Sequence, residues 1–269
     1  MLDFNNLPAK DKLYYLEDGI AIYCADCRDI LPLIPDKSID LVLTSPPYFN
    51  ERKYTQYQDF EHYHFTIYDI MRQLFRSICN FGTVVWNVSQ IISSRDMAYD
   101  LGSYSSMWLL ESGFNFFKKI IWRKAGYVSH SFRLAILNPY VSFYLPEACH
   151  EELIIYTKGN LNGNRKRRTP LDLLLAQKFN GDVWDIPQVN YGTPQWSEHP
   201  APFPNQLASN CISFFNESDG IILDPFLGSG TTAYCAKKLS RKCIGIEIEE
   251  KYCQIAKKRL SQSVMKFDI

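Results

Sequence analysis

Two short apolar runs, each followed at once by a turn of distinctive composition, constrain this chain most. Residues 221–223 lead into Asp224-Pro225-Phe226-Leu227-Gly228-Ser229-Gly230-Thr231-Thr232, and residues 39–43 lead into Thr44-Ser45-Pro46-Pro47-Tyr48. Short apolar runs of this kind are typical of strands in a parallel sheet that is buried on both faces. We therefore predict two buried strands, each ending in a candidate functional turn.

The glycine-containing turn has the features of a nucleoside site. Gly228 and Gly230 allow the backbone to approach a ligand closely, and a helix predicted over 231–239 offers free N–H groups at its start. The next predicted strand, 242–248, carries Glu247, an acid at a spacing suited to ribose hydroxyls. The alternative is that the glycines serve only a tight turn. The spacing is not that of the dinucleotide fingerprint, which disfavours a nicotinamide dehydrogenase.

The proline turn suits a different partner. Consecutive prolines fix two φ angles and remove two N–H donors, which leaves the carbonyl groups of Ser45 and Pro46 as rigidly placed acceptors. The amine of an extruded base is a donor, and Tyr48 offers an aromatic face on which such a base could stack. Catalysis there would consist of positioning and electrostatics without a covalent intermediate. A Pro-Pro turn in an ordinary loop is the alternative interpretation.

Together the two turns resemble the signature motifs of the DNA amino-methyltransferases, which methylate the exocyclic amine of cytosine or adenine with S-adenosylmethionine. The proline turn precedes the glycine turn, which is similar to the permuted order of the β class, and the resemblance covers residues 20–260. It implies an α/β, Rossmann-like methyltransferase fold with a mostly parallel sheet and helices on both faces. We expect a single domain over 1–269.

The resemblance also implies which residues form the site. Ser45, Pro46, Pro47 and Tyr48 would form the catalytic turn. A strand over 21–26 ends at the position of a family triplet that contacts the cofactor, with Ala25 in place of the usual glycine. Residues 198–207 resemble the family's H-P-x-x-x-P stretch, and a proline-rich linker is the alternative interpretation. The implied cofactor-binding residues are Asp26, Cys27, Phe203, Asn205, Asp224, Pro225, Phe226, Gly228, Ser229, Gly230, Thr231, Glu247 and Ile248.

The residue before the two prolines bears on the product. Many adenine enzymes of this family have Asp where this chain has Ser45, so we expect methylation of cytosine N4, with adenine N6 as the alternative. A catalytically silent DNA-binding module is a third interpretation, disfavoured by the intact turn. Glutamine methyltransferases resemble Asn-Pro-Pro-Tyr with the cofactor loop first, and neither feature occurs here. A 5-methylcytosine product needs a cysteine nucleophile, typically in a Pro-Cys pair, which the chain lacks.

Charge is unevenly distributed although the formal net charge is zero. Positive charges concentrate between residues 118 and 170, where the run Arg165, Lys166, Arg167 and Arg168 is expected to contact DNA phosphates; a solvated basic turn is the alternative. Segments 124–150 and 159–180 are the least periodic and are expected to recognise DNA.

Aromatic and polar residues interleave over 48–57 and 60–65, which indicates either a loop closing over the base or a packed surface segment. The expected partners are double-stranded DNA and a separate cognate restriction endonuclease.

Composition excludes several other classes. A hydrophobic fraction of 46% excludes wholesale disorder, and no apolar run approaches the ~18 residues of a membrane span. The N-terminus lacks a signal-peptide pattern, and the eight scattered cysteines suggest reduced thiols in a cytoplasm. Cys24 and Cys27 have no second pair of ligands at zinc spacing, so no metal is expected.

The remaining predicted elements are helices over 28–34, 68–79, 100–112 and 206–215, and strands over 82–88, 116–122, 151–157 and 182–186.

Overall fold

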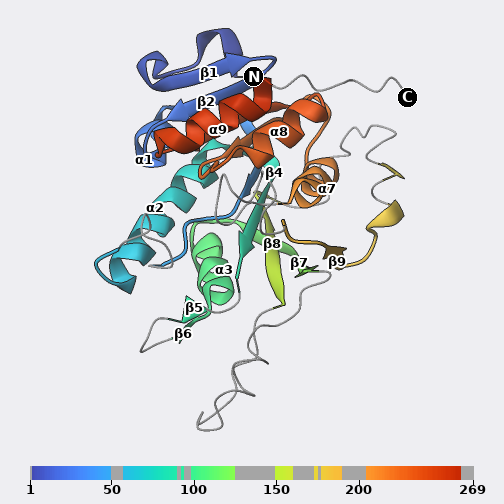
Figure 1. Cartoon of the computed structure of the whole chain (residues 1–269). Helices are drawn as coiled ribbons and strands as arrows, with labels where there is room; N and C mark the ends of the chain where they lie inside the picture. The colour runs from blue at the N-terminus through green and yellow to red at the C-terminus, as the bar shows by residue number, and fades with distance from the viewer. Residues whose placement is uncertain are drawn as a thin grey trace, which may run out of the picture.

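The computed structural model describes residues 2–49, 57–89, 92–93, 98–124, 149–159, 173–174, 177–189 and 204–261. Within these ranges a nine-stranded sheet carries helices on both faces (Figure 1). In spatial order its strands are β1 (Leu13–Glu17), β2 (Ile20–Cys24), β11 (Lys242–Glu247), β10 (Ile221–Asp224), β3 (Ile39–Thr44), β4 (Ile78–Val88), β8 (His150–Thr157), β7 (Asn115–Lys124) and β9 (Val183–Ile186). A separate two-stranded pair joins β5 (Ile92–Ser93) to β6 (Ala98–Tyr99).

The five central strands are parallel, as the apolar runs predict. Strands β2, β11, β10, β3 and β4 pair in this order and run the same way. Antiparallel pairing brings in β1 at one side and β8 and β7 at the other, and β9 then pairs with β7 in parallel. The prediction of a mostly parallel sheet is confirmed. The antiparallel strands extend it on both sides of the parallel centre.

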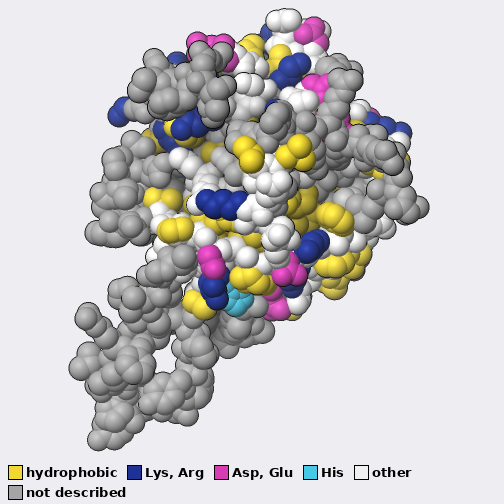
Figure 2. All heavy atoms as spheres, turned by 90° about the vertical axis from the view of Figure 1, so that its right-hand side faces the viewer, with side chains coloured by type: hydrophobic (Ala, Val, Ile, Leu, Met, Phe, Trp, Pro, Cys, Tyr) yellow, Lys and Arg dark blue, Asp and Glu magenta, His cyan; other side chains and the backbone are white. Residues whose placement is uncertain are grey.

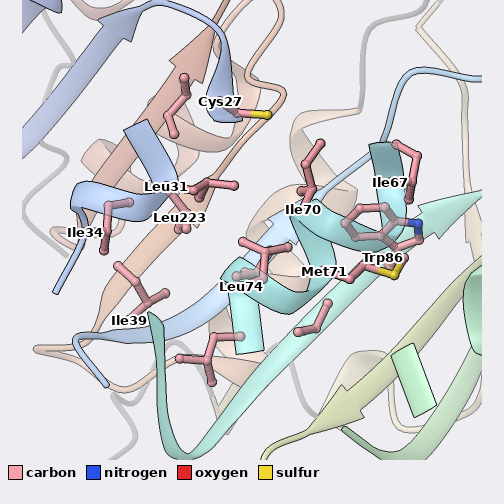
Figure 3. Packing of buried hydrophobic residues seen from close by; sticks show 14 of the residues in the cluster. Cys27, Leu31, Ile34, Ile39, Ile67, Ile70, Met71, Leu74, Trp86 and Leu223 are labelled. Carbon is pink, nitrogen blue, oxygen red and sulfur yellow. The ribbon is translucent and has the colours of Figure 1, made fainter. Parts of the chain in front are cut away.

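Each face of the sheet is covered by its own set of helices. Helices α1 (Cys27–Ile30), α2 (Phe60–Ser77) and α3 (Leu101–Glu111) bury their apolar residues in one core cluster. Figure 3 shows this cluster, in which Ile70, Met71 and Leu74 of α2 pack near Trp86 and Leu223 of the sheet. Helices α7 (Asn205–Phe215), α8 (Thr231–Lys238) and α9 (Glu250–Ser261) contribute to the cluster on the opposite face.

Residues 60–65 belong to helix α2, so of the two interpretations of this segment the closing loop is wrong. Asp59 caps α2 by accepting a 2.7 Å hydrogen bond from the His62 amide, and Phe60 stacks on Tyr99 with 4.1 Å between ring centroids. Tyr63 is fully buried, whereas Phe65 is exposed. The interleaved aromatic and polar residues therefore reflect the two sides of an amphipathic helix. Residues 50–56 of the other aromatic segment lie outside the described ranges.

Two further elements differ from the sequence prediction, each for a local physical reason. The helix expected over 28–34 is split into α1 and a 3₁₀ turn over Leu31–Leu33, because Pro32 has no N–H to continue the α-helical bonding. Strand β1, which was not predicted from the sequence, is joined to β2 by Asp18 and Gly19 with φ angles of 51° and 74°. Such an Asp-Gly pair is a typical two-residue hairpin turn. Among the described residues, no helix has the length and apolar character needed to cross a membrane.

Candidate active site at the carboxyl edge of the sheet

The strand order brings the two sequence motifs to one edge of the sheet. Because the five central strands are parallel and adjacent, their carboxyl ends form a single row. Asp26 follows β2, Glu247 ends β11, Asp224 ends β10, Ser45 follows β3, and Asn87 lies near the end of β4. The carboxyl edge of such a sheet is where ligands of open α/β folds bind. The proline turn and the glycine turn, far apart in sequence, are thus direct neighbours.

The glycine turn is held by its neighbouring strand. The amide of Gly228 donates a 2.8 Å hydrogen bond to Oε2 of Glu247, and the amide of Leu227 donates to the carbonyl of Ile246. Gly228 and Gly230 both have positive φ angles, 55° and 84°, and α8 begins at the next residue, Thr231. The N-cap of α8, Gly230, makes no side-chain cap bond, and the N–H groups of a helix's first turn have no partner within the helix, which suits them to a ligand.

Glu247 is oriented by main-chain donors on both of its oxygens. Oε1 accepts a 2.9 Å hydrogen bond from the amide of Glu249, while Oε2 accepts from Gly228. Each carboxylate oxygen keeps a further lone pair that could accept from a sugar hydroxyl. Burial raises the pKa of Glu247, and the two amides partly oppose that shift. The neighbouring Ile248 is 62% exposed and lies directly after the strand.

Asp224 is buried and hydrogen-bonded. Its Oδ1 accepts 2.7 Å and 3.1 Å hydrogen bonds from the hydroxyl of Thr44 and the amide of Phe226. Burial raises the pKa of Asp224 to about 6, and the hydrogen bonds, including one from Thr232, limit the rise. Pro225 and Phe226 continue the turn, and the ring of Phe226 packs edge-on against Trp86 with 6.2 Å between centroids.

Asp26 is less available than the other two acids. It caps α1 and accepts hydrogen bonds from the backbone and guanidinium of Arg28, with the shortest contact at 2.6 Å. The guanidinium holds the pKa of Asp26 below its usual range. The Cys27 thiol beside it is buried, and burial raises its pKa to about 12, so the thiol is neutral near pH 7. In the described part of the chain, no cluster of three or more His, Cys, Asp or Glu residues could hold a metal ion.

The proline turn packs against the core and contacts β4. Pro46 is buried, Ser45 and Pro47 are half-buried, and Tyr48 packs beside the core cluster that contains α2. The hydroxyl of Ser45 lies 3.4 Å from both the carbonyl oxygen and the side-chain nitrogen of Asn87. That nitrogen also donates a 2.7 Å hydrogen bond to Glu151 at the start of β8.

A buried arginine hydrogen-bonds three of the residues that are candidates for cofactor binding. Arg259 of α9 donates hydrogen bonds to the carbonyl and hydroxyl oxygens of Ser229, to the hydroxyl of Thr231 and to Oδ1 of Asn205, at 2.8 to 3.2 Å. It therefore links the glycine turn to the start of α7, which puts Asn205 beside that turn. Phe203 lies outside the described residues.

Several residues of this edge were not predicted from the sequence. Asn87 had a usable signal, because it is a polar residue inside the apolar strand 84–88. Thr44 could have been suspected from its place between the strand and Ser45. Glu151, Lys124 and Arg259 had no local signal, because their partners come from distant elements.

The basic segment divides into two parts. Four of its cations on β7 are paired with acids: Lys118 with Asp182, Lys119 with Glu152, Arg123 with Asp185 and Lys124 with Glu151. Figure 2 shows basic and acidic side chains close together on the face that is the right-hand side of Figure 1. These four cations are therefore engaged by acids of the same chain. The run Arg165, Lys166, Arg167 and Arg168 and most of 124–150 and 159–180 lie outside the described residues.

The sheet places a glycine turn beside a proline turn at its carboxyl edge, which is the arrangement that the resemblance to the amino-methyltransferases implies. A family model described as DNA methylase (N6_N4_Mtase) matches residues 39–258. The chain belongs to this family of S-adenosylmethionine-dependent DNA amino-methyltransferases, as its two motifs predict.

Individual relatives agree with this assignment. The chain is 29% identical to the type II methyltransferase M.ScaI of Streptomyces caespitosus, over 94% of this chain and 84% of that protein. It is 28% identical to M.BglII of Bacillus subtilis, over 96% and 72% of the two chains. Among solved structures, the protein TTHA0409 of Thermus thermophilus, complexed with S-adenosylmethionine, matches at 25% identity with a TM-score of 0.70 and coverage of 91% and 95%. The cytosine-N4-specific PvuII methyltransferase shares the fold, with a TM-score of 0.74, 20% identity and coverage of 98% and 92%.

Proposed function

We propose that this DNA methyltransferase transfers a methyl group to the exocyclic N4 amine of cytosine in DNA, as the modification enzyme of a restriction-modification system. The observation that carries the proposal is the placement of Ser45 next to the Asp224 strand at the carboxyl edge of the sheet. S-adenosylmethionine supplies the methyl group when bound, and the residues of the chain position the amine that receives it. The alternative product is N6-methyladenine.

The cofactor side of the site fits a nucleoside that carries a cationic methionine moiety. Glu247 keeps lone pairs for ribose hydroxyls, and Asp224 offers a carboxylate whose charge a cation would favour. The start of α8 offers free amides. Asp26 contributes through the turn that it caps, because Arg28 occupies its oxygens. We expect Cys27, Asn205, Pro225, Phe226, Ser229, Thr231 and Ile248 to line this site, with Phe203.

On the substrate side, the amine protons need acceptors. The carbonyls of Ser45 and Pro46 and the Ser45 hydroxyl can accept them, which localises the amine lone pair toward the methyl donor. Tyr48 provides the stacking face for the extruded base. Pro47 fixes the backbone between them.

The choice of cytosine follows from the neutrality and size of Ser45. Serine is shorter than aspartate and adds no charge, and the nearest acid along its hydrogen-bonded chain, Glu151, is paired with Lys124 at 2.9 Å. A neutral, shorter acceptor suits the smaller base. Family members that act on adenine often carry Asp at this position.

The proposed function is tested by identifying the methylated nucleoside that the enzyme produces. The purified protein is incubated with labelled S-adenosylmethionine and unmethylated DNA of mixed sequence, and the digested nucleosides are analysed by mass spectrometry. We expect N4-methylcytosine. N6-methyladenine alone would overturn the choice of base and leave the family intact, whereas label in neither nucleoside would contradict amino-methyl transfer.

Cofactor contacts are tested separately. Glu247→Ala removes two carboxylate oxygens, so S-adenosylmethionine affinity measured by calorimetry should fall by ~1–3 kcal/mol. Unchanged affinity in a folded variant would argue against the ribose role. Replacing Arg165, Lys166, Arg167 and Arg168 together with Gln should weaken binding to every DNA sequence and flatten its salt dependence, by a slope of up to ~0.9 for each phosphate that is no longer neutralised.

A further inference from the structure

A chain of polar contacts runs from Ser45 into the antiparallel part of the sheet. The side-chain nitrogen of Asn87 lies 3.4 Å from the Ser45 hydroxyl and 2.7 Å from Oε2 of Glu151, and Oε1 of Glu151 lies 2.9 Å from Nζ of Lys124. The four residues come from β4, β7, β8 and the turn after β3. Asn87 is buried, and the side chains of Lys124 and Glu151 are only 18% and 15% exposed.

The carboxylate fixes the orientation of the Asn87 amide. A carboxylate paired with lysine only accepts hydrogen bonds, so the nitrogen of Asn87 and not its Oδ1 must face Glu151. The opposite amide orientation would place two acceptors against each other. Asn87 Oδ1 is buried without a partner among the described atoms, so no competing contact favours the flip.

The oriented amide in turn sets the direction of the Ser45 hydroxyl. Because the nitrogen of Asn87 is a donor, the hydroxyl oxygen accepts from it and the hydroxyl proton points to the Asn87 carbonyl. One lone pair of the oxygen is then left over. At 3.4 Å both contacts are long, as catalytic hydrogen bonds often are before substrate binds.

We propose that Lys124 and Glu151 are positioning residues that act through Asn87 to present the Ser45 hydroxyl as an acceptor to the target amine. This inference rests on the proposed function of the proline turn and assigns its support to two strands that neither motif includes. A hydroxyl whose proton points at the amine would repel it. The ion pair therefore contributes to the rate of methyl transfer and not to cofactor binding.

A neighbouring ion pair provides the matched control. Lys119 and Glu152 pair at 2.8 Å on the same two strands, and Glu152 is the residue next to Glu151. Successive strand residues face opposite sides of a sheet, so Glu152 and Glu151 point away from each other. Lys119→Met breaks this pair on the same two strands without touching the chain to Ser45, and the Lys119 side chain is 42% exposed against 18% for Lys124.

The experiment compares Lys124→Met with Lys119→Met and with the charge-preserving Lys124→Arg. Single-turnover methylation of mixed-sequence DNA is measured with saturating S-adenosylmethionine, and cofactor affinity is measured by calorimetry. Lys124→Met should slow transfer about 10- to 100-fold, as expected for a misplaced reacting group. Lys124→Arg and Lys119→Met should stay within about 3-fold of wild type, because neither breaks the chain. Glu151→Gln should slow transfer in the same way as Lys124→Met.

A Ser45→Ala background tests whether the pair acts through Ser45. There, Lys124→Met should cost less than about 2-fold, because the hydroxyl that it orients is gone. Equal losses in both backgrounds, equal effects of Lys124→Met and Lys119→Met, or loss of the folding transition in Lys124→Met would each overturn the inference. A wild-type protein that transfers no methyl group to DNA would overturn the proposed function as well, which separates the two failures.

Discussion

The hydroxyl of Thr44 donates a 2.7 Å hydrogen bond to the carboxylate of Asp224, although 180 positions separate the two residues. Thr44 is the last residue of β3, and Asp224 is the last residue of β10, the strand paired with it. The contact joins the turn that would receive the base to the turn that would hold the methyl donor. The separation of the two turns is thus set by the pairing of β3 with β10.

Removing the Thr44 hydroxyl should weaken this connection. Thr44→Val keeps the shape of the side chain but leaves Asp224 without one of its donors, so the free energy of unfolding should fall by ~1–3 kcal/mol. Urea unfolding measures the loss, and single-turnover methylation should slow in the folded variant. Thr66→Val, which removes an exposed hydroxyl bonded within α2, is the control. Equal stability of the two variants would contradict a structural role for the contact.

The titration of Asp224 should make stability depend on pH. Burial raises its pKa from an ordinary value near 3.8 to about 6. Because the folded pKa exceeds the unfolded one, the group's stabilising contribution is present below about pH 4 and is lost as pH rises through about 6. This rise in the pKa of Asp224 corresponds to about 3 kcal/mol. In cofactor-free protein, Asp224→Asn should remove this pH dependence, so its stability relative to wild type should increase between about pH 4 and pH 7. Parallel pH profiles of the two proteins would contradict the assignment.

The parts of the fold that the sequence predicts are those with local signals. The strand ending at Asp224 and helix α3, whose N-cap is Asp100, are visible as apolar runs and caps. Helix α2 was expected to start eight residues too late, because its first turns are rich in His and Tyr, which mask the helical period until the cap at Asp59 is considered. The Asp18-Gly19 pair is a hairpin signal that the prediction did not use.

The residues of the candidate site also fall into those that local sequence signals predict and those that they do not. The turns around Ser45 and Gly228 follow from sequence because each lies at the end of one strand. Asn87 contacts Glu151, 64 positions away, and Arg259 contacts Ser229, 30 positions away. Which residues meet in these two contacts depends on strand register and helix packing. A buried Arg in an amphipathic helix gives no sign of what it binds. Residues 165–168 and Phe203 remain predictions.

The backbone at Gly230 should tolerate no larger residue. Its φ is +84°, and a Cβ there would lie 2.6 Å from the Cβ of Ala256 in α9. Gly230→Ala therefore combines left-handed strain of ~1–2 kcal/mol with a steric clash. Thermal unfolding should show a lower Tm, and cofactor affinity should fall. Adding Ala256→Gly removes the 2.6 Å contact but leaves the Cα of residue 256 at 3.0 Å and the backbone strain, so the double variant should recover part of the stability. A double variant no more stable than Gly230→Ala would show that the Cβ contact is unimportant.

Arg259 should support cofactor binding without touching the cofactor. It is buried, and it donates hydrogen bonds that hold Ser229, Thr231 and Asn205 in one arrangement. Arg259→Met keeps much of the side-chain volume but leaves these acceptors without their donor, which should cost ~1–3 kcal/mol of stability. Because the glycine turn is then less ordered, S-adenosylmethionine affinity measured by calorimetry should fall about 10-fold, as expected for about 1.4 kcal/mol. Lys258→Met, at an exposed position of the same helix, should change neither quantity. If Arg259→Met loses stability but binds the cofactor normally, Arg259 stabilises α9 against the sheet and the glycine turn is ordered without it, by Glu247 and by the backbone bond of Leu227 to Ile246.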